Sequence, residues 1–296
     1  MGGDMPEKTP ERKPLALLKM ALAILFSNPP IVLPFLCIAF VQLFIFEILL
    51  FAGRNPLRVF MGPIIQRMEG DIFLHYPFNY LLLIKWWQNS FLQSAIYIFI
   101  GSFFLGCAVA AIEAVNSNRS SNFTALLKKT LNSYVHLFAA AVITVSSMFF
   151  FSFLHGLVIG RALAIRSESG LLLWIKQAVL LSAPFVNLFI AALVTVLFIY
   201  VIPGIVLDGR KIWGALANNF RMLAKSAGIT FGVVLLSALL YIPAVVLKLF
   251  SPAYQKAVAP ELWPIVPLLG VFLSLFIDAL QYTAITTYYL LMKETK

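Results

Sequence analysis

The sequence predicts an all-α polytopic membrane protein with about six transmembrane helices and three amphipathic helices at the cytoplasmic interface. Hydrophobic residues make up 61% of the 296 residues and charged residues only 11%, whereas soluble domains carry roughly 25% charged residues. Six apolar runs are each long enough to cross a hydrocarbon core of about 30 Å. A cationic amphipathic segment precedes every second run, which favours an integral membrane protein over any soluble class.

The chain divides into a tail and one membrane domain. Residues 1–13 are polar and charged, which predicts a short disordered tail. Residues 14–296 are expected to form a single helical transmembrane domain. Its connection at 53–90 holds three prolines, so we expect no continuous helix there. The expected spans are residues 31–51, 91–115, 135–160, 178–201, 227–249 and 265–291.

The amphipathic segment at residues 208–226 has an apolar arc opposite a cationic one. At 100° per residue the apolar arc comprises Ile212, Trp213, Leu216, Phe220 and Leu223, and Asn218 falls among the cations. We expect Asp208 to cap the helix N-terminus. Residues 116–133 form a second such segment and residues 14–28 a third helical patch. The cations expected at lipid head groups are Lys128, Lys129, Arg210, Lys211, Arg221 and Lys225.

These three segments predict a degenerate internal repeat. The pairs Ala16-Leu17, Ala125-Leu126 and Ala215-Leu216 occupy equivalent places. Each unit then consists of an interfacial helix, a span going out and a span coming back. The alternative is that cationic helices beside membrane spans are simply common; we favour the repeat because all three segments fall on one side of a six-span topology.

The distribution of cations predicts the orientation. Of the 22 Lys and Arg residues, 13 lie on the side that carries both termini and the amphipathic segments. This bias places both termini in the cytoplasm. Two glycosylation sequons, at Asn118 and Asn122, fall on that side and are interpreted as chance; glycosylation there would invert the orientation. Anionic phospholipids are the expected partner of the net charge of +10, with a membrane-protein partner as a further candidate and no nucleic acid.

Short motifs near the third amphipathic segment suggest a family. Residues 202–209 read IPGIVLDG, followed by Ala215-Leu216 and Lys225-Ser226, and residues 288–293 read YYLLMK. This pattern resembles the membrane domain attached to some bacterial glycerophosphoryl diester phosphodiesterases, and related stand-alone membrane proteins of unknown function. The resemblance implies a bacterial inner-membrane protein of about six spans. The phosphodiesterase domain has no room in this chain, so its activity is not carried over.

Motifs for catalysis and for metal or cofactor binding are lacking in the sequence. It contains no GxxxxGK[ST] phosphate loop, HExxH, CxxC or GxSxG motif. We therefore expect neither an enzyme nor a cofactor or metal. Cys37 and Cys107 lie in apolar runs and are interpreted as small buried hydrophobic residues.

Polar residues inside the spans are the remaining candidates for a functional site, because ionisable groups in lipid are costly and face the bundle interior. The candidates are Gln42, Glu47, His155, Asn187, Asp278 and Gln281.

Asp278 is the strongest of these candidates. It lies roughly 20 Å along the last span, too deep to reach water by snorkelling. Helical spacing places it on one stripe with Ser274, Gln281, Tyr282 and Tyr288. One interpretation is a structural hydrogen bond to Gln42, Asn187 or backbone; the other is a proton or cation site. The structural one is favoured because no second charge lies at the same depth. Glu47 is expected to pair with His155 or Arg161.

Three hypotheses of function follow. The first is an integral inner-membrane protein without a catalytic site, whose interfacial helices organise lipid or a partner. The alternative is a transporter or channel-like permease for a small or lipidic solute, indicated by the polar residues and by Pro34 and Pro184 inside spans. A lipid-modifying enzyme is suggested only by the catalytic companion domain of the resembling family.

Overall fold

The computed structural model describes residues 13–87, 90–117, 122–164, 170–247 and 264–294. Within them the chain is helical and contains no strand, so the predicted all-α class is confirmed. The predicted disordered tail and the sequon at Asn118 lie outside the described residues, apart from Lys13. Six helical segments are long and apolar enough to cross a membrane: Pro29–Phe51, Phe91–Asn116, Tyr134–Leu163, Gly170–Val206, Ile212–Leu239 and Ile265–Glu294.

The first third of the chain is broken by prolines, as predicted. Its elements are α1 (Pro14–Ser27), η1 (Pro29–Val32), α2 (Leu33–Phe51), α3 (Leu57–Met68), η2 (Asp71–Leu74) and α4 (Phe78–Trp87). Between α3 and η2, Glu69 accepts hydrogen bonds from Lys85 and Trp86 of α4. These two bonds hold the pKa of the Glu69 carboxyl below its usual range and tie α3 to α4.

The remaining helices form the rest of the bundle. They are α5 (Ser90–Ile96), a π-helical turn η3 (Tyr97–Gly101), α6 (Ser102–Asn116), α7 (Phe123–Asn132), α8 (Tyr134–Leu163), α9 (Gly170–Phe198), α10 (Val201–Val206), α11 (Ile212–Leu239) and α13 (Ile265–Glu294). The Asn122 side chain caps α7 by accepting from the Thr124 N–H at 3.1 Å.

Helix α11 corrects the prediction for residues 208–226. An interfacial helix followed by a separate span was expected, but one helix runs through both, because the stretch contains no proline or other strong breaker. Asn218, placed among the cations by its spacing, is buried, whereas Trp213 is 76% and Phe220 49% exposed. The prediction that Asp208 caps the helix is also wrong, since the N-cap residue is Lys211.

Asn219 explains why a polar face of α11 turns inward. Its side-chain carbonyl accepts from the Tyr200 N–H at 3.0 Å, and its amide donates to the Leu197 carbonyl at 2.7 Å. These backbone groups lie where α9 ends, and burying them without partners would be costly. The inward face is therefore selected by hydrogen bonding at a helix end as well as by hydrophobicity.

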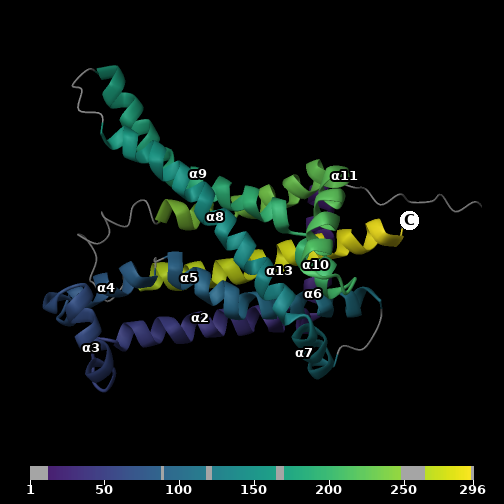
Figure 1. Cartoon of the computed structure of the whole chain (residues 1–296), viewed down its shortest axis with the longest axis horizontal. Helices are drawn as coiled ribbons and strands as arrows, with labels where there is room; N and C mark the ends of the chain where they lie inside the picture. The colour runs from purple at the N-terminus through teal and green to yellow at the C-terminus, as the bar shows by residue number, and fades with distance from the viewer. Residues whose placement is uncertain (1–12, 88–89, 118–121, 165–169, 248–263, 295–296) are drawn as a thin grey trace, which may run out of the picture.

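Helix α13 is the centre of the bundle. It packs against α1, α2, α6 and α11, and its second half is buried almost all round. In Figure 1, α2, α5 and α13 run roughly parallel, while the α8–α9 hairpin leaves them at an angle toward the upper left. The hairpin exposes many large apolar side chains, among them Phe150, Phe153 and Trp174. Such a surface is stable only in lipid, which agrees with an integral membrane protein.

Candidate functional site

A cavity of about 350 Å³ lies inside the bundle, between α2, α5, η3, α6, α8, α9 and α13. Part of its wall is apolar, from residues such as Ile38, Leu105 and Met148. The rest is polar, although all of these helices belong to long apolar spans. The polar lining residues are Gln42, Gln93, Ser94, Tyr97, Thr144, Thr195, Asp278, Gln281 and Tyr282.

Asp278 lies on this cavity, together with Gln42 and Gln281 from the predicted set. Of the described residues that line the cavity, Asp278 is the one carboxyl group, and none is Lys, Arg or His. It is half-buried, between the fully buried Ile277 and Ala279. Three residues of the stripe predicted from helical spacing, Asp278, Gln281 and Tyr282, therefore line a polar space inside the protein, whereas Ser274 and Tyr288 are not among its lining residues.

The other predicted intramembrane residues lie elsewhere. His155 Nδ1 and Asn187 Oδ1 are 2.9 Å apart, which joins α8 to α9 within the hairpin. Asn187 is thus not a partner of Asp278. The expected pairing of Glu47 with His155 or Arg161 is wrong, because Glu47 is exposed on α2 and forms no ion pair with either in the part of the chain that the structure describes. Asn187 bonds His155 instead, since the hairpin brings α8 and α9 together.

The π-helical turn η3 shapes one wall of the cavity. Tyr97 and Gly101, its first and last residues, both line the space. A π-turn carries one extra residue and re-aims the side chains beside it, and such turns occur frequently at functional sites. Its backbone is supported by two hydroxyls: Ser102 donates to the Ile98 carbonyl at 2.7 Å, and Tyr134 of α8 donates to the Phe99 carbonyl at 2.8 Å.

A second cavity, of about 760 Å³, adjoins the first, since Gln42 and Gln93 line both. It extends along the first half of α13, from Val266 to Phe276, and reaches Trp87 of α4. The two cavities therefore follow α13 from its beginning to Asp278. Further along α13, the buried hydroxyls of Thr283 and Thr286 have no hydrogen-bond partner among the described residues.

Past Asp278, buried polar side chains join α9, α10, α11 and α13. The Tyr200 hydroxyl, just after α9, lies within hydrogen-bonding distance of Thr230 and 3.2 Å from Ser226, both on α11. All three residues are buried. Fully partnered buried hydroxyls of this kind fix one arrangement of helices.

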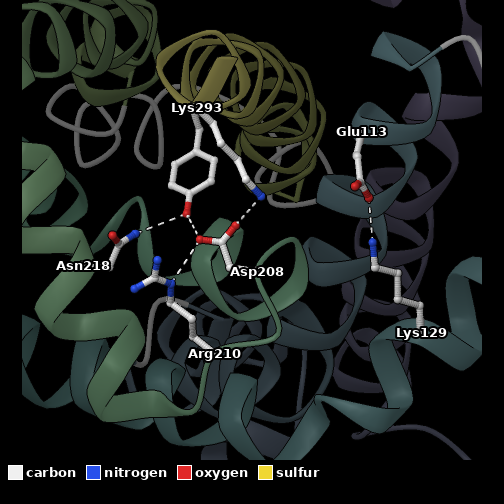
Figure 2. A network of polar contacts seen from close by, with 7 residues as sticks. Glu113, Lys129, Asp208, Arg210, Asn218 and Lys293 are labelled. Carbon is white, nitrogen blue, oxygen red and sulfur yellow. Dashed lines mark hydrogen bonds and ion pairs between the residues drawn. The ribbon is translucent and has the colours of Figure 1, made fainter. Parts of the chain in front are cut away.

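Asp208 is the centre of a polar network at the same end of the bundle (Figure 2). Its carboxylate accepts from Tyr289 Oη at 2.7 Å, Lys293 Nζ at 2.9 Å and Arg210 Nε at 3.1 Å. Asn218 of α11 donates in turn to Tyr289 Oη at 3.2 Å. Burial alone would raise the pKa of Asp208, but the hydrogen bonds from Lys293 and Tyr289 and the charge of Lys293 outweigh it and lower the pKa.

A second ion pair lies close by. Lys129 of α7 donates to Glu113 of α6 at 2.6 Å, and Figure 2 shows it beside the Asp208 network. Two of the six cations expected at lipid head groups, Lys129 and Arg210, thus bind carboxylates of the protein. The others are exposed and form no ion pair in the described part of the chain: Lys128, Lys211, Arg221 and Lys225.

Comparison with known proteins gives no relative: no family model, no curated protein and no solved structure matches this chain. The phosphodiesterase-domain resemblance and the threefold repeat therefore stay predictions. In the described residues no group of three or more His, Cys, Asp or Glu could hold a metal ion.

Sequence reasoning missed part of the cavity wall: Gln93, Tyr97, Thr144 and Thr195. Gln93 could have been found from the sequence, because it is a polar residue inside an apolar run. Tyr97 could not, because nothing in the sequence indicates the π-turn that positions it.

Proposed function

We propose that this protein is a transporter or channel-like permease of the inner membrane, which admits a small polar solute to the cavity around Asp278. One observation carries the proposal: a carboxyl, three amide side chains and several hydroxyls gather on one space inside a bundle of apolar spans. Polar groups removed from water cost free energy unless they are hydrated or bind a ligand. A cavity of this volume is of the size that encloses one small molecule.

The arrangement along α13 supports access from one side. The larger cavity leads from the beginning of α13 to the cavity of Asp278, and the hydroxyl cluster and Asp208 network lie beyond it. With both termini in the cytoplasm, as the cation bias predicts, the open side faces outward and the Asp208 end is the closed cytoplasmic side. Transporters that alternate access need one side closed in this way.

Cysteine accessibility tests the proposal. In a protein whose native Cys37 and Cys107 are replaced by Ala, we introduce Ser274→Cys and Gln281→Cys on the cavity walls, and Phe150→Cys on the exposed surface of α8 as a matched control. A membrane-impermeant thiol reagent should label the first two and not the third. Proteoliposomes should also accumulate small polar solutes faster than protein-free liposomes.

Two results together would reject the permease. If no cavity cysteine reacts and flux equals that of protein-free liposomes, the space is closed and Asp278 has a structural role. If lipid-phase quenchers reach residues 274 and 281 better than residue 150, the stripe faces lipid.

A second candidate function is the organisation of anionic lipid or of a partner. It is supported by the exposed surface of α11, which carries Trp213 and Phe220 on one side and Arg221 and Lys225 on another. Exposed aromatic and cationic side chains on one helix are typical of the membrane interface. This function does not use the cavity, so the two proposals are tested separately.

A further inference from the structure

We infer that the cavity around Asp278 selects a small organic monocation, a protonated amine or a quaternary ammonium ion. The inference rests on the proposed function, because it requires that a solute enters the cavity. It goes further in assigning the charge and chemical class of that solute.

The charge of the lining carries the first step. Asp278 supplies one negative charge when ionised, and the described lining offers no Lys, Arg or His to compensate it. At this depth the medium screens charges weakly, so an anionic solute would meet an unopposed carboxylate. A monocation would neutralise it and allow Asp278 to stay ionised. A zwitterion would lack a cationic partner for its own carboxylate.

The aromatic side chains carry the second step. Tyr97 from η3 and Tyr282 from α13 line the same space as Asp278. Phe35 packs on the Tyr282 ring at a centroid distance of 6.5 Å and so limits where that ring lies. Aromatic faces attract ammonium groups, most strongly where water is excluded. A carboxylate together with two tyrosines is suited to an organic cation.

The set of oxygen atoms in the lining argues against a divalent metal cation such as Ca²⁺. Ca²⁺ requires about six to eight oxygen ligands and commonly several carboxylates. Here one carboxyl group is available, and no cluster of acidic or His side chains lies near it in the described residues. Gln42, Gln93 and Gln281 also line the cavity, and a side-chain amide oxygen can accept a hydrogen bond from an N–H or O–H donor on the solute.

Binding to the full-length protein in detergent tests the inference. The cationic probes are tetramethylammonium and ethanolammonium. Ethylene glycol is the neutral control compound and glycolate the anionic one, and each compound is titrated by calorimetry. The wild-type protein should bind at least one cation at least about tenfold more tightly than either control compound, a preference equivalent to about 1.4 kcal/mol. This comparison needs no variant.

Variants then locate the site. Asp278→Asn should weaken cation binding by at least about tenfold, and Asp278→Glu, which keeps the charge, should retain most of it. Glu47→Gln removes an exposed carboxylate of α2 that does not line the cavity, and should leave binding unchanged. Tyr97→Phe keeps the ring and should bind tetramethylammonium like the wild type, whereas Tyr97→Leu should bind it more weakly.

The outcomes separate the two proposals. Equal binding of ethylene glycol and of the cations, unaffected by Asp278→Asn, overturns the cation assignment and leaves the permease standing. Tighter binding of glycolate than of the cations would also overturn the cation assignment and leave the permease standing. If none of the four probes binds and no flux is seen, both proposals fail. If Asp278→Asn does not fold, loss of the wild-type cation preference in a folded Asp278→Glu protein would also overturn the assignment.

Discussion

Single residues decide how the closed end of the bundle is held. Asp208 lies in the short connection between α10 and α11, yet its carboxylate binds Tyr289 and Lys293 at the end of α13. Its side chain is only 12% exposed, so these contacts are partly protected from water. One carboxylate thereby ties the connection between α10 and α11 to the end of α13, about 80 residues later in the chain.

Replacing this carboxylate tests its importance. We expect Asp208→Asn to lower the free energy of unfolding by about 1.5–3 kcal/mol, since bonds to a charged, partly buried group are lost. Thermal unfolding in detergent measures the change. Glu294→Gln, which changes an exposed carboxylate at the end of the same α13, is the control and should have almost no effect. Equal destabilisation by both variants would show that the hydrogen bonds of Asp208 contribute no more to stability than an exposed carboxylate does.

The lowered pKa of Asp208 predicts an acid-sensitive stability. A group whose pKa is lower in the folded protein than in the unfolded chain stabilises the fold fully above its ordinary pKa, about 3.9 for Asp. That contribution is lost as the pH falls through the lowered pKa of the folded state. The difference in stability between wild type and Asp208→Asn should therefore shrink below about pH 4. A difference that stays constant down to pH 2 would contradict this assignment.

Packing between helices is close where α6 meets α7 and α8. A Cβ on Gly106 would lie 2.7 Å from both Leu137 Cδ1 and Thr130 Cγ2, and those two residues are fully buried. Gly228 of α11 faces open space instead. The two glycines thus form a matched pair in long helices.

We expect Gly106→Ala to destabilise the protein by about 1–3 kcal/mol, because the added methyl overpacks the contact. Gly228→Ala should be neutral or slightly stabilising, since Ala favours the helix and meets nothing. Thermal melts of both variants provide the measurement. A Gly106→Ala protein as stable as wild type would mean that α6 and α7 separate easily.

The outer face of α11 gives a prediction for the element as a whole. Spin labels replacing Trp213 and Phe220 should be quenched by lipid-soluble oxygen, because these side chains are exposed on the surface of α11 at the expected membrane interface. Labels replacing Arg221 and Lys225 should be quenched by a water-soluble nickel chelate. The same accessibility at all four positions would remove α11 from the interface and with it the second candidate function.

At the scale of the whole molecule, the six spans predicted from the sequence correspond to six helical segments of the described residues that are long and apolar enough to cross a membrane, because such an apolar run is visible in composition. Expected and observed ends agree closely for Phe91–Asn116. The expected and observed ends disagree for α11, because the amphipathic pattern of its first half predicted a separate helix. They also disagree for Gly170–Val206, whose first turns had been assigned to a connection.

The polar cavity was only partly predictable, because its wall is formed by several helices. Helical periodicity identified the stripe around Asp278, since it depends on one helix. The identity of the facing residues depends on how helices rotate against one another, and on a π-turn that one sequence does not reveal. Thr144 and Thr195 become neighbours of Asp278 only after α8 and α9 pack.

Topology is the prediction that belongs to the whole chain. Reporter fusions after residues 70, 168 and 256 should indicate the outer side, and fusions at either terminus the cytoplasm, because 13 of the 22 cations lie on the side of the termini. The last two fusion sites lie outside the described residues. Cytoplasmic signals at any two of the three sites would overturn the orientation and reverse the direction of access proposed above.

The unequal lengths of the spans make bilayer thickness a physical variable for this protein. Pro29–Phe51 has 23 residues and α9 alone has 29, or about 35 Å against about 44 Å at 1.5 Å per residue. A hydrocarbon core of about 30 Å accommodates the longer one only if it tilts or extends beyond the core. The α8–α9 hairpin contributes Thr144 and Thr195 to the cavity wall, whereas α2 and α13 contribute the opposite side. Longer acyl chains should draw the hairpin more upright and so change the width of the cavity.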